Sequence, residues 1–170
     1  MKLILDGNVN VYYIQTLCMI FFPGEKFGAA EQEAPDAPML SLRLRARNGG
    51  MEAAVTVTAN GKSASATRFL EDSEHHTGEK TAKLVCGLAV IAACGQLLGY
   101  RPSWGMLTGV RPSKVATELL RQGLSKTRVK KILASEYSVI PKKAALATDV
   151  AINEQKIIGN PGRRDCSLYI

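Results

Sequence analysis

The sequence predicts an α+β protein, in which an antiparallel β-meander packs on long helices and a small, basic, all-helical segment follows. Three observations support this class. Apolar and polar residues alternate through much of residues 40–70, as in strands with one buried face. Residues 78–98 have the composition of a long buried helix. Beyond residue 100 the chain becomes basic and its apolar residues recur at helical spacing.

The N-terminal part begins with a short expected strand, residues 1–6, which a turn at Gly7 and Asn8 ends. From Val9 onward apolar residues recur at helical spacing until Pro23-Gly24, which breaks the helix. A loop is expected over residues 26–38, because this stretch is rich in glycine, proline and acidic residues.

Two hairpin signals, Asn48-Gly49-Gly50 and Asn60-Gly61, divide the meander into three strands. The polar face of the first strand carries three arginines, which could form a ligand-binding stripe. We favour a solvated sheet face, in which these arginines pair with a neighbouring acid. The residues concerned are Arg43, Arg45 and Arg47, with Glu52 as the neighbouring acid.

The helix expected at residues 78–98 carries a wide apolar stripe, and we expect it to pack on the meander and form the core. His75 and His76 lie just before it. Adjacent side chains point in different directions, so they are a poor metal-ligand pair. We expect them in a loop, with the helix capped near Thr77.

A glycine-rich stretch with the sequence GMLTGVRPSK, residues 105–114, follows this helix, and we call it the signature loop. Gly105 and Gly109 let the backbone turn where other residues would be strained, and Pro112 suits the first turn of a helix. Arg111 and Lys114 therefore flank a helix start, where free N–H groups and the helix dipole favour an anion. We take both as candidate substrate-binding residues; the alternative is a structural connection whose charges meet water.

Arg101 and Trp104 precede this loop and join the candidate substrate-binding residues. Trp104 could stack on a flat ligand or cover the edge of the core, and the second interpretation is favoured.

Three helices are predicted beyond the loop, at residues 110–122, 125–137 and 141–158, with Gly123 and Ser125 as caps between the first two. The candidate inner positions of the third helix are Leu146, Val150, Ile152 and Ile157.

Charge is unevenly distributed along the chain. Residues 1–100 carry nine Lys/Arg and ten Asp/Glu, a net charge of −1, whereas residues 101–170 carry thirteen and five, a net charge of +8. A basic half can bind a nucleic acid, an acidic small molecule or a partner domain with an acidic surface.

Four cysteines, at positions 18, 86, 94 and 166, lack the C-x-x-C spacing of zinc and redox sites. Cys86 and Cys94 lie in the apolar helix and are expected to be small buried residues. Cys166 alone cannot hold an iron–sulfur cluster. We therefore expect no metal site and no cofactor in this chain.

The segment LTGVRPSK, the basic helices after it and the terminal CSLYI together resemble one family. They are similar to the region that precedes the catalytic domain in HemZ-type, oxygen-independent coproporphyrinogen III oxidases (coproporphyrinogen dehydrogenases). These are radical S-adenosylmethionine (radical SAM) proteins. In that family an S-L-Y-I strand leads directly into a CxxxCxxC cluster motif.

This resemblance implies an accessory domain at residues 1–100, the signature loop with its helical segment at 101–162, and the first strand of a missing radical SAM domain at 163–170. It implies that the parent is an oxidoreductase that uses a [4Fe–4S] cluster and S-adenosylmethionine to oxidise coproporphyrinogen III, while this chain has no catalytic residue of its own. The implied partners are the missing catalytic domain and a porphyrinogen or haem.

The alternative function is a helix-turn-helix-like nucleic-acid-binding module. The turn at Gly123 and the cations Arg128, Lys130 and Lys131 suggest it, but groove-reading residues are lacking, so we do not expect nucleic acid as a partner. The apolar run at residues 84–98 is shorter than the ~20 residues that span a membrane. No targeting segment is evident, so a cytoplasmic location is expected.

Overall fold

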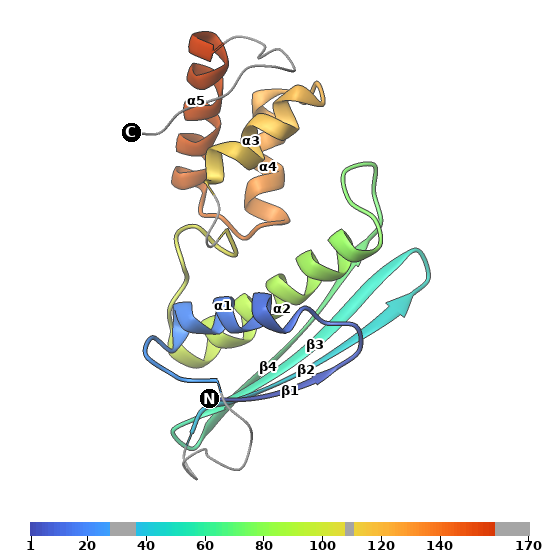
Figure 1. Cartoon of the computed structure of the whole chain (residues 1–170), viewed down its shortest axis with the longest axis vertical. Coiled ribbons are helices and arrows are strands. Elements are labelled where there is room, and N and C mark those ends of the chain that lie inside the picture. The colour runs from blue at the N-terminus through green and yellow to red at the C-terminus, as the bar shows by residue number, and fades with distance from the viewer. Residues whose placement is uncertain (28–36, 108–110, 159–170) are drawn as a thin grey trace.

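The computed structural model describes residues 1–27, 37–107 and 111–158 of the chain and confirms the α+β class (Figure 1). Two layers, a sheet and the helices on it, form one part, and a group of three helices stacks on the helix side of that part. The elements are β1 (Lys2–Asp6), α1 (Val11–Phe21), β2 (Met39–Arg47), β3 (Gly50–Ala59), β4 (Lys62–Glu71), α2 (Glu79–Leu98), α3 (Pro112–Arg121), α4 (Lys126–Ser135) and α5 (Pro141–Ile158).

The sheet has the strand order β1-β2-β3-β4. The expected meander is present: β2 pairs antiparallel with β3, and β3 with β4. Gly49 and Gly61 occupy the hairpin turns with φ of 73° and 70°, which a side chain rarely adopts. Sequence analysis did not predict that β1 joins this sheet by pairing parallel with β2. Parallel neighbours need a long crossover connection, and α1 lies in it.

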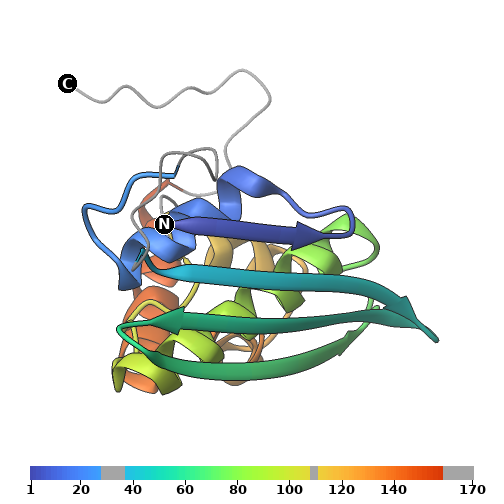
Figure 2. The ribbon, with the colours of Figure 1, turned by 90° about the horizontal axis from the view of Figure 1, so that it is seen from below.

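Helices α1 and α2 cover one face of the sheet, and the other face is open (Figures 1 and 2). The covered face carries the alternating apolar residues of the meander, which pack beneath the helices. We call residues 1–27 and 37–100 the sheet lobe. Its largest fully buried side chains are Ile14, Leu17, Leu40, Leu42, Val55, Val57, Val85 and Val90.

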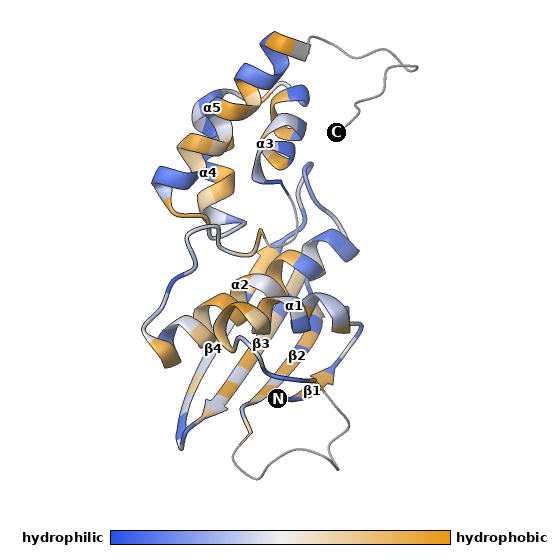
Figure 3. Cartoon of the chain, turned by 60° about the vertical axis from the view of Figure 1, so that its left-hand side comes forward, coloured by the Kyte–Doolittle hydropathy of each residue, from blue (hydrophilic) through white to orange (hydrophobic). Residues whose placement is uncertain are grey.

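Helix α2 begins and ends at glycines with positive φ, Gly78 at 53° and Gly99 at 65°. The cap expected near Thr77 lies one residue further on, at Gly78, which has no side chain to cap the helix and whose N–H donates to the Asp72 carboxylate at 3.2 Å. The expected length of the apolar run, residues 84–98, was also too short: α2 has 20 residues, and an 18-residue stretch of it with a mean hydropathy of 1.7 is long and apolar enough to cross a membrane. More than half of that stretch is buried, as in the core helix of a folded domain. Figure 3 shows the hydrophobic colouring of α2 where it lies along the sheet.

Helices α3, α4 and α5 form the helical lobe, residues 111–158, around a second core. Ser125 caps α4 as expected, accepting from the Arg128 N–H at 3.3 Å. Three of the four inner positions expected on α5 are wrong, since Leu146, Val150 and Ile157 are exposed, whereas Ile152 is half-buried. Small residues face inward instead, because α5 packs closely against both α3 and α4. They are Ala144, Ala147, Thr148 and Ala151.

Candidate functional site

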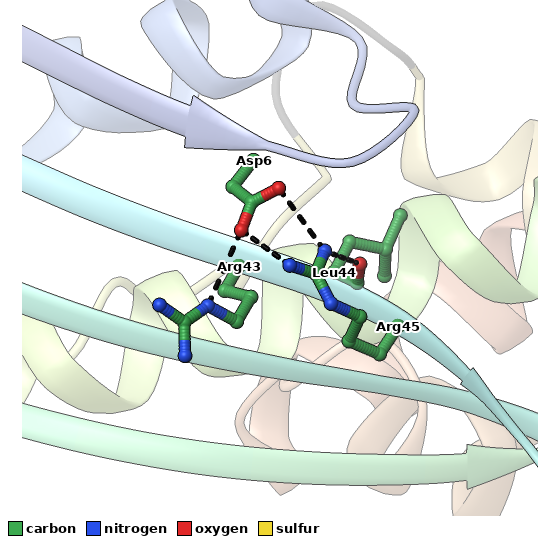
Figure 4. Close-up of polar contacts among 4 residues, drawn as sticks. All are labelled: Asp6, Arg43, Leu44 and Arg45. Atoms are coloured by element: carbon green, nitrogen blue, oxygen red, sulfur yellow. Dashed lines mark hydrogen bonds and ion pairs between the residues drawn. The ribbon is translucent and has the colours of Figure 1, made fainter.

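The arginines on the open face of the sheet form ion pairs with carboxylates. Arg45 donates to Asp6 at 3.1 Å and Arg43 donates to the same carboxylate at 3.3 Å (Figure 4). Hydrogen bonds from Arg45 and then Arg43 lower the pKa of the Asp6 carboxyl from its ordinary value. Arg47 pairs with Glu52 at 3.0 Å. The expected pairing therefore holds, with Asp6 as a second acid that sequence analysis missed.

A cleft of about 540 Å³ lies between α2, the edge strand β4 and the segment that enters α5. Its apolar floor comes from α2: Leu88, Ile91, Ala92 and Gly95. Its rim is polar, with Arg68 from β4, Tyr100 and Arg101 from the chain after α2, and Ser138 from the helical lobe. Residues from both lobes thus line one cleft, whose size lies within the usual range for small-molecule sites.

The two arginines of this cleft differ from those on the open face of the sheet. Arg68 donates to the Thr67 carbonyl at 2.9 Å. Within the described ranges, neither Arg68 nor Arg101 has a carboxylate partner. An unpaired guanidinium is a planar fork of donors that matches a carboxylate or phosphate. The cleft therefore combines an apolar floor with two guanidinium groups on its rim.

Sequence analysis missed Arg68, although a signal was present. Arg68 lies opposite Ala53 in the β3–β4 register, and Ala53 is fully buried on the helix-covered face. The alternation of Ala64, Ala66 and Leu70 places Arg68 among inward positions. A cation at an inward position of an edge strand points towards the rim of the covering helix, which is where the cleft lies.

The structure brings only one of the expected substrate-binding residues, Arg101, into this cleft. Trp104 is half-buried beside the core of the helical lobe, and the Lys143 Nζ lies 5.1 Å from its ring centroid. Arg111 is the N-cap of α3, with no side-chain capping bond, and Lys114 is exposed in the first turn. Neither of these two residues lines the cleft.

The signature loop forms part of a close joint between the lobes. Gly105 has a φ of 54°, and a Cβ there would meet the Tyr137 carbonyl oxygen at 2.1 Å. The Met106 N–H donates to that carbonyl at 3.0 Å, and the Ile140 N–H donates to the Ser103 carbonyl at 3.1 Å. Only glycine fits this position. Pro112 occupies the first turn of α3, as expected, and Gly109 lies outside the described residues.

A buried histidine links the two lobes beside this joint. The His76 ring is 5% exposed, with Nδ1 3.2 Å from the Thr81 hydroxyl and Nε2 3.5 Å from Glu136 at the end of α4. The Thr81 hydroxyl also donates to Asp72. His76 thus joins the lobes by contacting Glu136, a partner 60 residues away in sequence that no local pattern revealed.

The described residues do not fit an iron–sulfur cluster. No group of three His, Cys, Asp or Glu side chains that could hold a metal occurs in residues 1–27, 37–107 and 111–158. Cys18, Cys86 and Cys94 are buried, and desolvation raises the pKa of each thiol to about 12. Cys166 and the expected strand at 163–170 lie outside the described residues, so the expectation about cofactors stays a prediction.

Fold and site together define a class: a small α+β module with an attached three-helix lobe and a two-arginine cleft where they meet. Comparison with models of known protein families finds no match, and no curated protein matches significantly.

Proposed function

We propose that this chain is an accessory region of a larger radical SAM oxidoreductase and that its cleft holds a carboxylate-bearing tetrapyrrole. The observation that carries the proposal is the two-arginine cleft with an apolar floor. A tetrapyrrole is flat and apolar at its centre and bears carboxylates at its edge, so it needs both kinds of surface. The cleft volume of about 540 Å³ suits one side of such a macrocycle.

The resemblance of LTGVRPSK to the coproporphyrinogen oxidase family supplies the reaction class, and the cleft supports the ligand class independently. In this proposal the chain itself holds no cofactor and performs no catalytic step. The missing catalytic domain brings the cluster and S-adenosylmethionine, while Arg68 and Arg101 orient the substrate's carboxylates. The protein works in the cytoplasm, where haem precursors and reduced thiols coexist.

Titration of the chain with coproporphyrin or haem tests this proposal. Trp104 is the only tryptophan and lies close in sequence to Arg101, so porphyrin binding in the cleft should quench its fluorescence. Replacing Arg68→Gln or Arg101→Gln should weaken binding by about tenfold or more, because a charged hydrogen bond contributes roughly 1.5–3 kcal/mol.

The matched control is the double variant Arg43→Gln with Arg45→Gln, which removes two positive charges from the opposite face of the sheet. It should bind porphyrin as the wild type does. Equal binding by all variants, or no quenching at all, would contradict the proposal. Arg111→Ala and Lys114→Ala belong in the same titration. If only these two variants lost porphyrin affinity, the carboxylates would bind at the signature loop and not in the cleft.

A further inference from the structure

Helix α4 is the one helix of the described helical lobe that carries cations without any acid. It contains Lys126, Arg128, Lys130 and Lys131, and its first turn has no acidic residue. By contrast, α3 contains Glu118, and α5 contains Asp149 and Glu154. Within the described ranges, none of the four α4 cations forms an ion pair.

Helix stability does not explain this composition. Cations near a helix N-terminus oppose the helix dipole, and Lys126 and Arg128 lie there. Lys126 and Lys130 are four residues apart, a spacing at which like charges repel on the helix surface. The sheet lobe shows the contrast, since each of its three neighbouring arginines is paired with a carboxylate, Asp6 or Glu52.

The lack of groove-reading residues argued against a nucleic-acid partner, but contacts to the phosphate backbone need none. Contrary to the expectation from the sequence, we propose that the solvent face of α4 binds the phosphate backbone of a double-stranded nucleic acid without reading its sequence. Val129, Ile132 and Leu133 point into the helical core, so the opposite face meets solvent. Arg128 and Lys131 are exposed and lie three residues apart, which makes them neighbours on that face. Exposed Thr127 and Ser135 share it and add hydroxyl groups, which together with cations are the usual phosphate-binding side chains.

The chemistry of this face favours a nucleic-acid duplex over other polyanions. Apart from its cations, α4 exposes only Thr127 and Ser135, neither of them apolar. A membrane-surface helix needs apolar side chains to insert, and a protein interface needs a buried apolar or aromatic anchor. Single-stranded nucleic acid is bound with aromatic side chains that stack on the bases, and α4 has none. Ten residues cover about 15 Å of a charged backbone.

Fluorescence anisotropy of the chain with a labelled duplex of about 20 base pairs tests the proposal, with salt varied between about 50 and 200 mM. Binding through three or four cations should give a slope of log K against log salt of about −3 to −4. The double variant Arg128→Gln with Lys131→Gln should reduce the magnitude of that slope by about two. The same variant should bind porphyrin normally, which keeps this result separate from the test of the cleft.

Arg43→Gln with Arg45→Gln is again the matched control, because it removes the same net charge from another surface. It should leave duplex binding unchanged, and equal losses in both double variants would overturn the proposal, since net charge alone would then explain binding. The titration is run with duplex DNA and with duplex RNA, which shows which of the two nucleic acids supplies the phosphate backbone. Tighter binding to phosphatidylserine vesicles than to either duplex, or absence of duplex binding at low salt, would also overturn it.

Discussion

The two lobes bury different kinds of side chain. The sheet lobe has a larger core between a sheet and two helices, in which leucine, isoleucine, valine and phenylalanine outnumber its six alanines by about two to one. The helical lobe has nine buried apolar residues, and four of them are alanines. Because hydrophobic stabilisation grows with the apolar area buried, the sheet lobe has much the larger share. The helical lobe therefore depends more on its joint with the sheet lobe, where Gly105 and the His76–Glu136 pair lie.

The largest expected effect lies in the core of the sheet lobe. Leu42→Ala removes a side chain that is 1% exposed between β2 and the helices, so it should destabilise the protein by about 2–5 kcal/mol. Denaturant midpoints measure this loss. Leu146→Ala, at an exposed position of α5, is the control and should stay within about 0.5 kcal/mol of the wild type. Similar losses at both positions would mean that the contrast between the lobes is wrong.

Gly105→Ala should have the next largest effect, because Gly105 lies where the two lobes are in contact. Its φ of 54° and the 2.1 Å approach of the Tyr137 carbonyl oxygen leave no place for a Cβ. We expect a loss of about 1–3 kcal/mol, with faster hydrogen exchange in the helical lobe than in the sheet. Gly123→Ala is the control, since it has a positive φ of 84° but open space around it. Equal losses of stability in both variants would mean that backbone strain at a positive φ explains the effect, and that the close contact of Gly105 with Tyr137 contributes nothing.

Glu136→Gln tests the contact across the lobes with a near-isosteric change. The amide oxygen can still accept from the His76 ring, but a charged acceptor is replaced by a neutral one, so we expect a loss of about 1 kcal/mol. Thermal melts measure the stability, and the ¹⁵N shifts of the His76 imidazole report whether the surroundings of the ring change. An unchanged imidazole signal would show that Glu136 does not contact the ring.

The smallest effect should come from the outer face of the sheet lobe. Asp6→Asn removes the carboxylate that Arg45 and Arg43 share, but all three side chains are solvated, so only a slight fall in melting temperature is expected. The folded protein lowers the pKa of this carboxyl from 3.8, so its contribution is present above that pH and is lost as the pH falls further. A difference from wild type that persists in strong acid would contradict this origin.

Local patterns were sufficient for most of the elements. Alternation and Asn-Gly turns located β2, β3 and β4, and Ser125 located the start of α4, because these signals lie within a few residues. The parallel pairing of β1 with β2 was missed, since it joins segments more than 30 residues apart. The buried face of α5 was predicted wrongly, because its large apolar residues were expected to be the buried ones. In a tight helical packing small residues lie inside, and Leu146 is left outside.

The cleft could be predicted only in part. Arg101 was expected from its place beside the signature loop, whereas Arg68 joins it only because α2 and β4 lie side by side in the fold. Arg111 and Lys114 were chosen for a favourable local environment at a helix start, and nothing local indicates which way such a turn faces. His76 and Glu136 meet because the helical lobe sits on the sheet lobe, a relation that no single segment encodes.

The apolar length of α2 has a consequence during protein synthesis. An isolated helix of 20 residues with this hydropathy could be taken by membrane-insertion machinery for a spanning segment. All four strands of the sheet precede it in the chain, so the surface on which α2 packs has already been translated when α2 emerges. At about 5–20 residues per second, α2 itself takes only about 1–4 s to be made. The order of the elements thus limits the time for which this helix is exposed before its sheet can cover it.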